Sequence, residues 1–443
     1  MSSAAGSTAA GRDEAARRRS RRKWWYVSAA EARVQATIAA VALWVVAGAI
    51  LLTGSGHRSA FGPLKGTDFI QFYTLAHLDA RTAPSTLYDP EAFHELQTKL
   101  VPDSDPERYL IVYPPHVVLL FRPLAGLSYG TALLAWDVVL AIGYGVCVWL
   151  AWRPFRSWLG DRRLVAAAAA AFPPAYLLVL HGQTSIVPMI AFCLGWLALE
   201  RGKRFWAGAA LGLLLLKPQL AIILVPLVLF CREWTMLAGA AAMVATQATA
   251  TAALLGTSVI REYVSVVAHL GDVNLLLEPK PSEMHSLSAI TNHLPSPWGG
   301  AMWVALATCI VIQTIRVWRC AAPISARMAC LVVASLLVSP HLFSYDVVVL
   351  ALPLVWYAAY VCSRADRQDS DRAAFACLYP LYFFLLAPTA RVVPGVQASV
   401  LLMTALFIVM SRTVMRGRLT IAASGLAGDI GSPRGAFTRV VRP

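Results

Sequence analysis

Long apolar runs separated by short polar segments recur along almost the whole chain. The first, from about Val34 to Leu52, has roughly the twenty residues that a helix needs to cross a bilayer. It follows an arginine-rich stretch and is longer than the core of a signal peptide, so we expect an uncleaved anchor. Hydrophobic residues make up 58% of the 443 residues and charged residues only 14%. A soluble domain rarely has this composition, and we predict an all-α polytopic membrane protein.

The hydrophobic pattern predicts about twelve transmembrane helices. The apolar segment at 110–127 is short and contains Arg122 and three prolines, so we expect it to re-enter or to lie at the interface. Besides the first run, the expected crossings lie at about 129–152, 164–180, 184–200, 205–217, 218–231, 235–255, 298–316, 327–340, 345–362, 373–388 and 397–413.

Basic residues define the expected sidedness. With the N-terminus in the cytoplasm, 27 of the 38 lysines and arginines fall in segments on the inner side, as the positive-inside rule requires. Both termini are then cytoplasmic, and we expect the protein in the cytoplasmic (inner) membrane. The predicted division is a disordered basic tail (1–31), one transmembrane domain (32–413) with outer loops at 54–128 and 256–297, and a cytoplasmic tail (414–443).

The net charge of +14 does not indicate a nucleic-acid partner, because the cations lie in short runs between apolar stretches rather than on one solvated face. All nine histidines are expected in outer loops or at their borders, whereas the inner loops contain none. The eight cysteines lie in apolar spans or on the inner side without a CxxC pair, which indicates neither a disulfide framework nor a zinc site. We therefore expect an outward-facing site with no metal and no cofactor.

Asp68 is the first acidic residue after the first apolar run. Together with Thr67 it precedes a helical pattern that includes Phe69 and Phe72. One interpretation is that Asp68 is a helix N-cap, a role that typically contributes about 1 kcal/mol to the stability of the helix. The other is a general base that accepts a hydroxyl proton. The spacing of residues leaves both open.

Lys217 interrupts a long apolar stretch in the sequence Lys217-Pro218-Gln219. We expect the lysine where two short helical halves meet, and helix ends together with a lysine can bind phosphate. The alternative is a lysine whose ammonium extends to the membrane interface.

Further polar residues mark the outer segments. His116 and Arg122 enter an apolar segment, where ionisable groups usually have a partner or a task. Asp89 precedes a proline, a pair that is common in loops, so we favour a turn over a functional role for this residue. The short turn His181-Gly182-Gln183-Thr184-Ser185 lies between two spans, and the other candidates are Tyr73, Tyr88, Tyr113, His285, His341, Tyr345 and Asp346.

These motifs together resemble one family. In chain order, and covering roughly residues 34–413, they are similar to glycosyltransferase family 87, of the C-type, polyprenol-phosphate-sugar-dependent superfamily, which includes mannosyltransferases acting on phosphatidylinositol mannosides. The matching motifs are Asp68-Phe69 with Tyr73, Leu87-Tyr88-Asp89-Pro90, Tyr113-Pro114-Pro115, Gly182-Gln183, Lys217-Pro218-Gln219 and Ser339-Pro340-His341 with Tyr345-Asp346.

The resemblance implies a C-type glycosyltransferase architecture, with outer-face loop helices, that moves a sugar, typically mannose, with inversion. The donor would be a polyprenyl-phosphate sugar, and the acceptor a lipid or glycan hydroxyl on the outer face. Asp68 would be the base and His341 a second catalytic residue near the donor phosphate. The phosphate would also contact Lys217, Gln219, Arg122, His181 and Gln183, and the acceptor or loop candidates would be Tyr73, Tyr88, Asp89, Tyr113, His116, His285, Tyr345 and Asp346.

One segment departs from the family pattern. Residues 81–84 read Arg-Thr-Ala-Pro where a glycine is expected before Leu87-Tyr88, which affects the shape of the loop more than the base. A lipid-linked donor needs no nucleotide site, in agreement with the lack of a glycine-rich phosphate loop in the sequence.

Two other classes of function fit parts of the pattern. Broken helices at Pro173-Pro174 and Lys217-Pro218 are also typical of a secondary transporter or lipid flippase. Against this, the sequence has no inverted repeat, and its ionisable groups gather on one face. A membrane scaffold would not require so many outward histidines.

Overall fold

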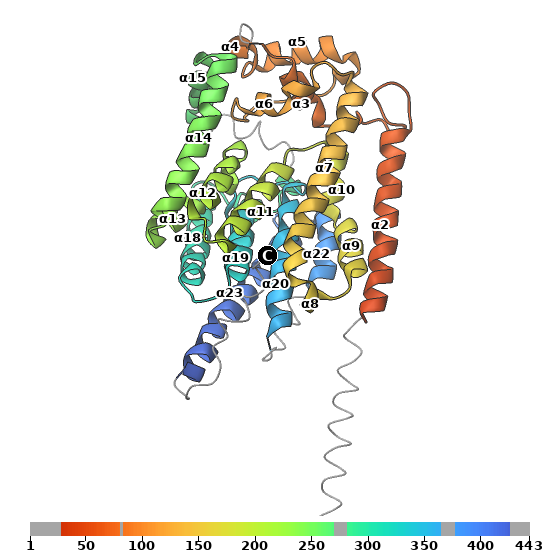
Figure 1. Cartoon of the computed structure of the whole chain (residues 1–443). Helices are drawn as coiled ribbons and strands as arrows, with labels where there is room; N and C mark the ends of the chain where they lie inside the picture. The colour runs from red at the N-terminus through yellow and green to blue at the C-terminus, as the bar shows by residue number, and fades with distance from the viewer. Residues whose placement is uncertain (1–27, 80–82, 270–280, 365–376, 426–443) are drawn as a thin grey trace, which may run out of the picture.

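The structure, a computed structural model, describes residues 28–79, 83–269, 281–364 and 377–425 (Figure 1). The regular elements of these residues are helices, and two isolated backbone bridges join Arg58 to Leu64 and Met284 to Phe343. The α-helices are α2 (Ala29–Leu52), α3 (Phe69–Ala76), α4 (Ala83–Thr86), α5 (Pro90–Leu100), α6 (Val117–Phe121), α7 (Tyr129–Trp152), α8 (Arg156–Leu159), α9 (Arg162–Ala170), α10 (Pro173–His181), α11 (Ile186–Glu200), α12 (Arg204–Gly212), α13 (Leu224–Cys231), α14 (Trp234–Leu255), α15 (Ser258–Ala268), α17 (Ser288–Thr291), α18 (Trp298–Trp318), α19 (Ile324–Val338), α20 (Ala351–Ser363), α22 (Leu378–Leu386) and α23 (Ala398–Gly425).

Short 3-10 helices connect several of these elements. They are η2 (Pro102–Ser104), η3 (Arg122–Leu124), η4 (Arg153–Phe155), η5 (Leu213–Leu216), η6 (Pro218–Leu220), η7 (Pro281–Glu283), η8 (Asp346–Leu350) and η9 (Thr389–Arg391).

Six helical stretches of the described residues are long and apolar enough to cross a membrane. The bent pair α9 and α10 makes a seventh if it counts as one span. Helices occur in all the expected spans, but several of them are short, such as α13 with eight residues. The expected count of about twelve crossings is therefore not confirmed. The six stretches are Ala29–Leu52, Tyr129–Leu159, Trp234–Leu255, Trp298–Trp318, Asp346–Ser363 and Ala398–Arg416.

The two predicted tails are only partly described. Residues 1–27 lie outside the described residues, and α2 already begins at Ala29, inside the range predicted to be disordered. Ser28 caps this helix by accepting the backbone N–H of Glu31, whose carboxylate accepts the N–H of Ser28 in return. At the other end, α23 continues past the expected boundary at 413 to Gly425, and residues 426–443 lie outside the described residues.

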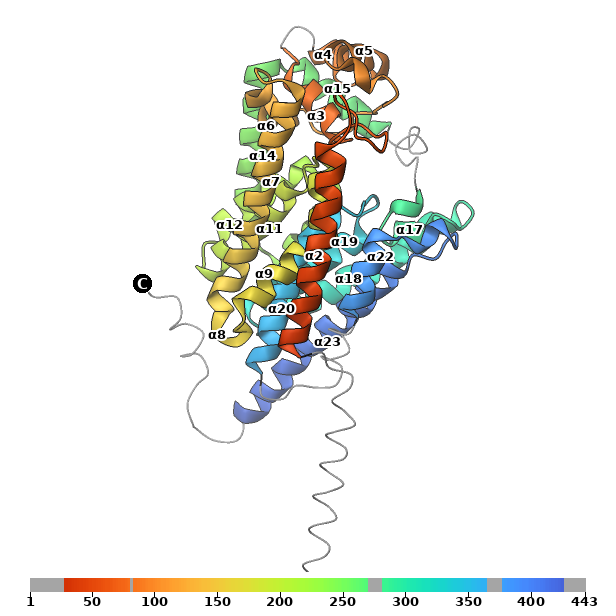
Figure 2. The same cartoon turned by 90° about the vertical axis from the view of Figure 1, so that its right-hand side faces the viewer.

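Residues 54–79 and 83–128 form a cap over one end of the helical bundle. Its helices α3 to α6 gather at the top in both views (Figures 1 and 2). All eight residues of α3 are buried, and Phe72 stacks on Phe121 with ring centroids 4.7 Å apart. The segment 110–127 contributes only α6 and η3, and α6 lies beside α3 in the cap. We call the opposite end of the bundle, where α7 ends at Trp152, the far end.

The bend between α9 and α10 follows from two prolines. The helices meet at 48° where Pro173 and Pro174 lack the N–H groups that would bond the carbonyls of Ala169 and Ala170. Two side chains replace these donors: the hydroxyl of Tyr144 bonds Ala169 O, and the indole N–H of Trp44 bonds Ala170 O, each at 2.9 Å. This is the compensation that a broken helix requires in an apolar medium.

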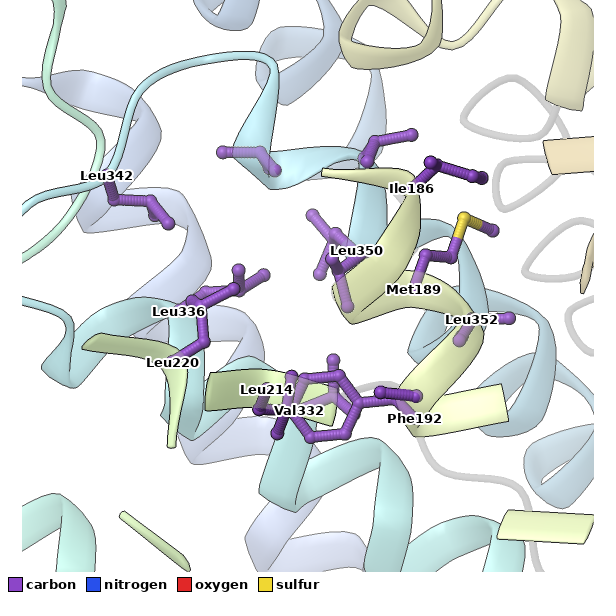
Figure 3. Close-up of a cluster of buried hydrophobic side chains, with 14 of the residues drawn as sticks. Ile186, Met189, Phe192, Leu214, Leu220, Val332, Leu336, Leu342, Leu350 and Leu352 are labelled. Atoms are coloured by element: carbon purple, nitrogen blue, oxygen red, sulfur yellow. The ribbon is translucent and has the colours of Figure 1, made fainter. Parts of the chain in front are cut away.

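The core of the bundle lies between α11, α19 and the η8–α20 segment. Figure 3 shows side chains of α11, such as Phe192, among those of α19, such as Val332. Leu214 and Leu220, which flank Lys217 in the chain, belong to the same buried cluster. The apolar core therefore contains residues from both sides of Lys217, which lies between η5 and η6.

Helices α12 and α14 touch at two glycines. A Cβ atom on Gly208 would lie 1.8 Å from the carbonyl oxygen of Met236, and one on Gly239 would lie 1.9 Å from that of Phe205. Neither distance is possible for a real side chain, so the two backbones approach this closely only because both residues are glycine.

We expect Gly208→Ala to lower the free energy of unfolding by about 1–3 kcal/mol or more, because α12 and α14 must separate to admit the methyl group. Gly130→Ala is the matched control, since Gly130 is also helical but has open space around its missing Cβ. Thermal unfolding of the purified protein in detergent measures both. Equal midpoints for the two variants would contradict the close packing.

Candidate active site

The turn formed by residues 181–185, which we call the site turn, joins α10 to α11 beneath the cap. Gly182 ends α10 in the left-handed region at φ 61°, and a Cβ there would lie 2.6 Å from Cβ of Phe69. The indole N–H of Trp136 bonds Gly182 O at 2.9 Å. Glycine at this position lets the turn press against the start of α3 and brings its side chains to Asp68.

Asp68 occupies the N-cap position of α3, but its side chain makes no capping hydrogen bond. Its Oδ2 instead accepts Nε2–H of Gln183 at 2.7 Å and lies 3.8 Å from Nδ1 of His181. The carboxylate is 22% exposed. The capping interpretation is therefore wrong for this side chain, which faces the site turn and remains accessible.

Gln183 has a defined orientation. Its Oε1 accepts the hydroxyl of Tyr113 and the backbone N–H of Thr184, each at 3.2 Å, which leaves the amide NH₂ for Asp68. Nδ1 of His181 lies 2.7 Å from the hydroxyl oxygen of Thr67. Gln183 thus holds one oxygen of the Asp68 carboxylate, and His181 of the same turn lies beside that oxygen.

Two cap tyrosines border this group. The hydroxyl of Tyr109 donates to the carbonyl of Thr67 at 2.9 Å. Burial, followed by the negative charge of Asp68, raises the pKa of Tyr109 well above its usual value, and burial raises the pKa of Tyr113. Both phenols remain neutral hydrogen-bond donors beside the carboxylate.

Lys217 and Asp346 form a buried ion pair that contacts Ser185 of the site turn. Nζ of Lys217 lies 2.5 Å from Oδ1 of Asp346 and 2.9 Å from Oγ of Ser185, and that hydroxyl donates to the same carboxylate oxygen at 2.6 Å. The backbone N–H of Phe343 bonds the other oxygen at 3.2 Å. Both charged side chains are 3% exposed. Lys217 therefore does not extend to an interface, and it already has a counterion.

Aromatic rings connect the ion pair to the Asp68 group. Nζ of Lys217 lies 5.1 Å from the ring centroid of Tyr345 and 6.0 Å from that of Tyr113. The rings of Tyr345 and His181 are 5.7 Å apart. One polar network, which we call the site network, thus joins segments that are far apart in the chain. These segments are 67–68, 109–113, 181–185, 217 and 345–346.

His341 lies next to the site network. It is half-buried, its ring is 4.8 Å from that of Phe343, and Phe343 is 5.6 Å from Tyr345. His285 supports this loop through its backbone, whose N–H bonds Leu342 O at 2.8 Å. The His285 side chain points elsewhere: it is fully buried 2.6 Å from Oγ of Ser399, and burial lowers its pKa to about 3.

The remaining sequence candidates lie in the cap or next to Lys217, between η5 and η6. Asp89 accepts two N–H groups at the start of α5, as expected of a capping residue, and exposed Arg122 donates to the carbonyl of Leu78. Burial lowers the pKa of His116 to about 4. Tyr73 donates to Leu127 O, Tyr88 donates to Tyr113 O, and Gln219 lies half-buried in η6.

Three members of the site network had no assigned role in the sequence analysis: Thr67, Tyr109 and Ser185. Ser185 follows Gln183 by two residues in the same turn, a spacing that could have identified it. Tyr109 stands in a loop without a motif and gave no signal. Among the residues that the structure describes, no group of three or more histidine, cysteine and acidic side chains is placed to hold a metal ion.

The family model for glycosyltransferase family 87 matches residues 111–340, just over half of the chain. This range contains Tyr113, the site turn and Lys217. Asp68 precedes it, and Tyr345 and Asp346 follow it shortly after its end. No curated protein and no solved structure matches the chain.

We expect Asp346→Asn to lower the free energy of unfolding by roughly 3–5 kcal/mol, because it leaves the Lys217 ammonium buried without a counterion. The double variant Lys217→Met with Asp346→Leu should recover most of that loss, since two apolar side chains replace the two charges. Detergent-solubilised protein unfolded by heat provides the comparison. Glu91→Gln, which removes an exposed partner of Arg108, is the control and should have almost no effect.

Proposed function

Because the chain belongs to glycosyltransferase family 87 and is thus a membrane glycosyltransferase, we propose that it transfers a sugar, most simply mannose, from a polyprenyl phosphate to a hydroxyl group. The acceptor is a lipid or glycan on the outer face of the cytoplasmic membrane, and the transfer inverts the anomeric centre. The observation that carries the proposal is the accessible Asp68 carboxylate, oriented by Gln183 within the network that contains Lys217.

Asp68 is the proposed general base. Gln183 and His181 engage only its Oδ2, so Oδ1 is available to a sugar or lipid hydroxyl. In the proposed step, Asp68 takes the hydroxyl proton while the acceptor oxygen bonds the anomeric carbon. The bond from that carbon to the phosphate oxygen breaks on the opposite face of the ring, and the lipid phosphate leaves with the electron pair.

Lys217 supports the proposed phosphate position, with a modification of the sequence-based view. Two of its three N–H groups are directed to Asp346 and Ser185, which leaves one for a phosphate oxygen. The paired carboxylate cancels its net charge, so the phosphate is held chiefly by hydrogen bonds from Lys217 and from neutral hydroxyls such as Tyr345. His341 and Gln219 remain candidates beside it, whereas the contact of Arg122 with Leu78 favours a role in the cap.

The transporter or flippase alternative rested on broken helices. At the α9–α10 break, Tyr144 and Trp44 satisfy the freed carbonyls, and at the second break Asp346 neutralises Lys217. Both breaks are thus internally satisfied, and family membership favours the transferase.

We expect Asp68→Asn to reduce sugar transfer by about 10²–10⁴-fold, because asparagine cannot accept the proton although its side-chain oxygen can still accept the Gln183 amide. The assay measures mannose transfer from polyprenyl-phosphate mannose to envelope lipids in proteoliposomes. Asp89→Asn is the matched control, since asparagine still caps α5, and its rate should remain that of the wild type. Full activity of Asp68→Asn would remove this carboxylate from the mechanism.

The proposed outer face of the site is testable by labelling. In a protein without its native cysteines, Phe61→Cys in the exposed part of the cap should react with a membrane-impermeant maleimide in intact cells. Lys203→Cys, in the exposed loop between α11 and α12, should react only after permeabilisation. The reverse pattern would place the cap inside the cell and reject transfer on the outer face.

A further inference from the structure

A cavity of about 940 Å³ lies apart from the site network, between α7 on one side and α9 and α10 on the other, with Trp44 of α2 along its edge. Figure 2 shows α2 passing in front of α9. No residue of the site network lines the cavity. Its apolar wall consists mainly of Leu140, Ala141, Gly145, Val148, Val165, Ala166, Leu178 and Val179.

The middle of the cavity offers little to a polar ligand. Tyr144 and Trp44 are its bulky polar side chains there, and both polar groups are used by the carbonyls at the α9–α10 break. Most of the other side chains along this part of the wall are alanine, glycine, valine and leucine. An apolar chain, rather than a sugar, fits this part of the wall.

The end of the cavity at the far end of the bundle has the opposite character. Arg156, Arg162 and Arg163 line it, together with Trp152. Nε1 of Trp152 is buried, and within the described part of the chain it has no hydrogen-bond partner. Three exposed arginines and an N–H donor without an acceptor at one end of the cavity favour an anionic group rich in oxygen.

The neighbouring acidic residue does not neutralise this end. Asp161 accepts the backbone N–H groups of Arg163 and Leu164 at the start of α9, and its other oxygen lies 3.1 Å from the guanidinium of Arg33. Its charge is therefore matched by a fourth arginine and by the helix end, and the three arginines that line the cavity stay in excess.

The arginine end and the site network are separated by the length of α7. Tyr129 at the start of this helix bonds Lys65 O in the cap, and Trp152 is its last residue. Twenty-four helical residues span about 36 Å, which is comparable to the thickness of the hydrocarbon core. In Figure 1, α8 and the cap accordingly lie at opposite ends of α7.

We propose that this cavity binds an anionic glycerophospholipid from the membrane leaflet opposite the site network. The phosphate lies among Arg156, Arg162 and Arg163 and accepts the Trp152 N–H, while an acyl chain extends along α7 toward Leu178. Basic pockets between membrane helices recognise lipid headgroups in this way. A sugar donor whose phosphate lies near Lys217 cannot also place that phosphate at the arginines, so the lipid is a separate ligand.

The test uses the full chain, purified in detergent and freed of lipid, with phosphatidylglycerol and phosphatidylcholine of equal acyl chains as probes. Native mass spectrometry measures the lipid retained. We expect preferential retention of phosphatidylglycerol, reduced about tenfold or more when Arg156, Arg162 and Arg163 are all changed to Gln. Changing Arg201, Lys203 and Arg232 to Gln removes equal charge elsewhere at the far end and should leave retention unchanged.

A second pair of variants tests the apolar wall. Gly145→Leu puts a side chain into open space in the cavity and should abolish retention, whereas Gly130→Leu fills open space elsewhere on α7 and should not. Equal retention of both lipids, or full retention by the arginine variant, would overturn the proposal. Polyprenyl phosphate serves as a third probe. If the protein retains it, and Gly145→Leu abolishes that retention while the triple arginine variant does not, the proposal is overturned and the cavity is assigned to the chain of the donor lipid. The readout does not use sugar transfer.

Discussion

The ion pair between Lys217 and Asp346 is the interaction on which the centre of this protein depends. Two charges removed from water are stable only when each finds the other and their remaining hydrogen-bonding groups are satisfied. Ser185 and the Phe343 N–H complete this arrangement, so α11, the break after η5 and the loop before η8 are tied at one point. The apolar core shown in Figure 3 adjoins these segments through Ile186, Leu214, Leu220 and Leu350.

Much of the fold was predictable from the sequence because hydrophobic length is a local property. The span expected at 129–152 coincides with α7, and the prolines at 173–174 do interrupt a helix. The number of crossings was harder to predict. Short apolar pieces such as α13 are indistinguishable from spans when they adjoin other apolar residues, and proline and lysine divide them in ways that only packing determines.

The candidate site was predictable in part, and chiefly from the family resemblance. Asp68 lies against Gln183 and His181, and Lys217 joins the same network through Ser185, while the roles that the resemblance implied for these residues stay predictions. The partner of Lys217 could not be read from spacing, because Asp346 lies 129 residues away and had been grouped with acceptor candidates. Arg122 donates to Leu78 O of the cap, and His285 of the later outer loop contacts Ser399 of α23. These partners are 44 and 114 residues away in the chain, so a sequence pattern does not reveal them.

The contact between Gly182 and Phe69 has a further consequence. The backbone of the site turn packs directly against α3, all eight residues of which are buried, so the turn and the Asp68 end of α3 form one tightly packed junction. A side chain larger than glycine at position 182 would push the turn away from α3 and draw the Gln183 amide away from the Asp68 carboxylate.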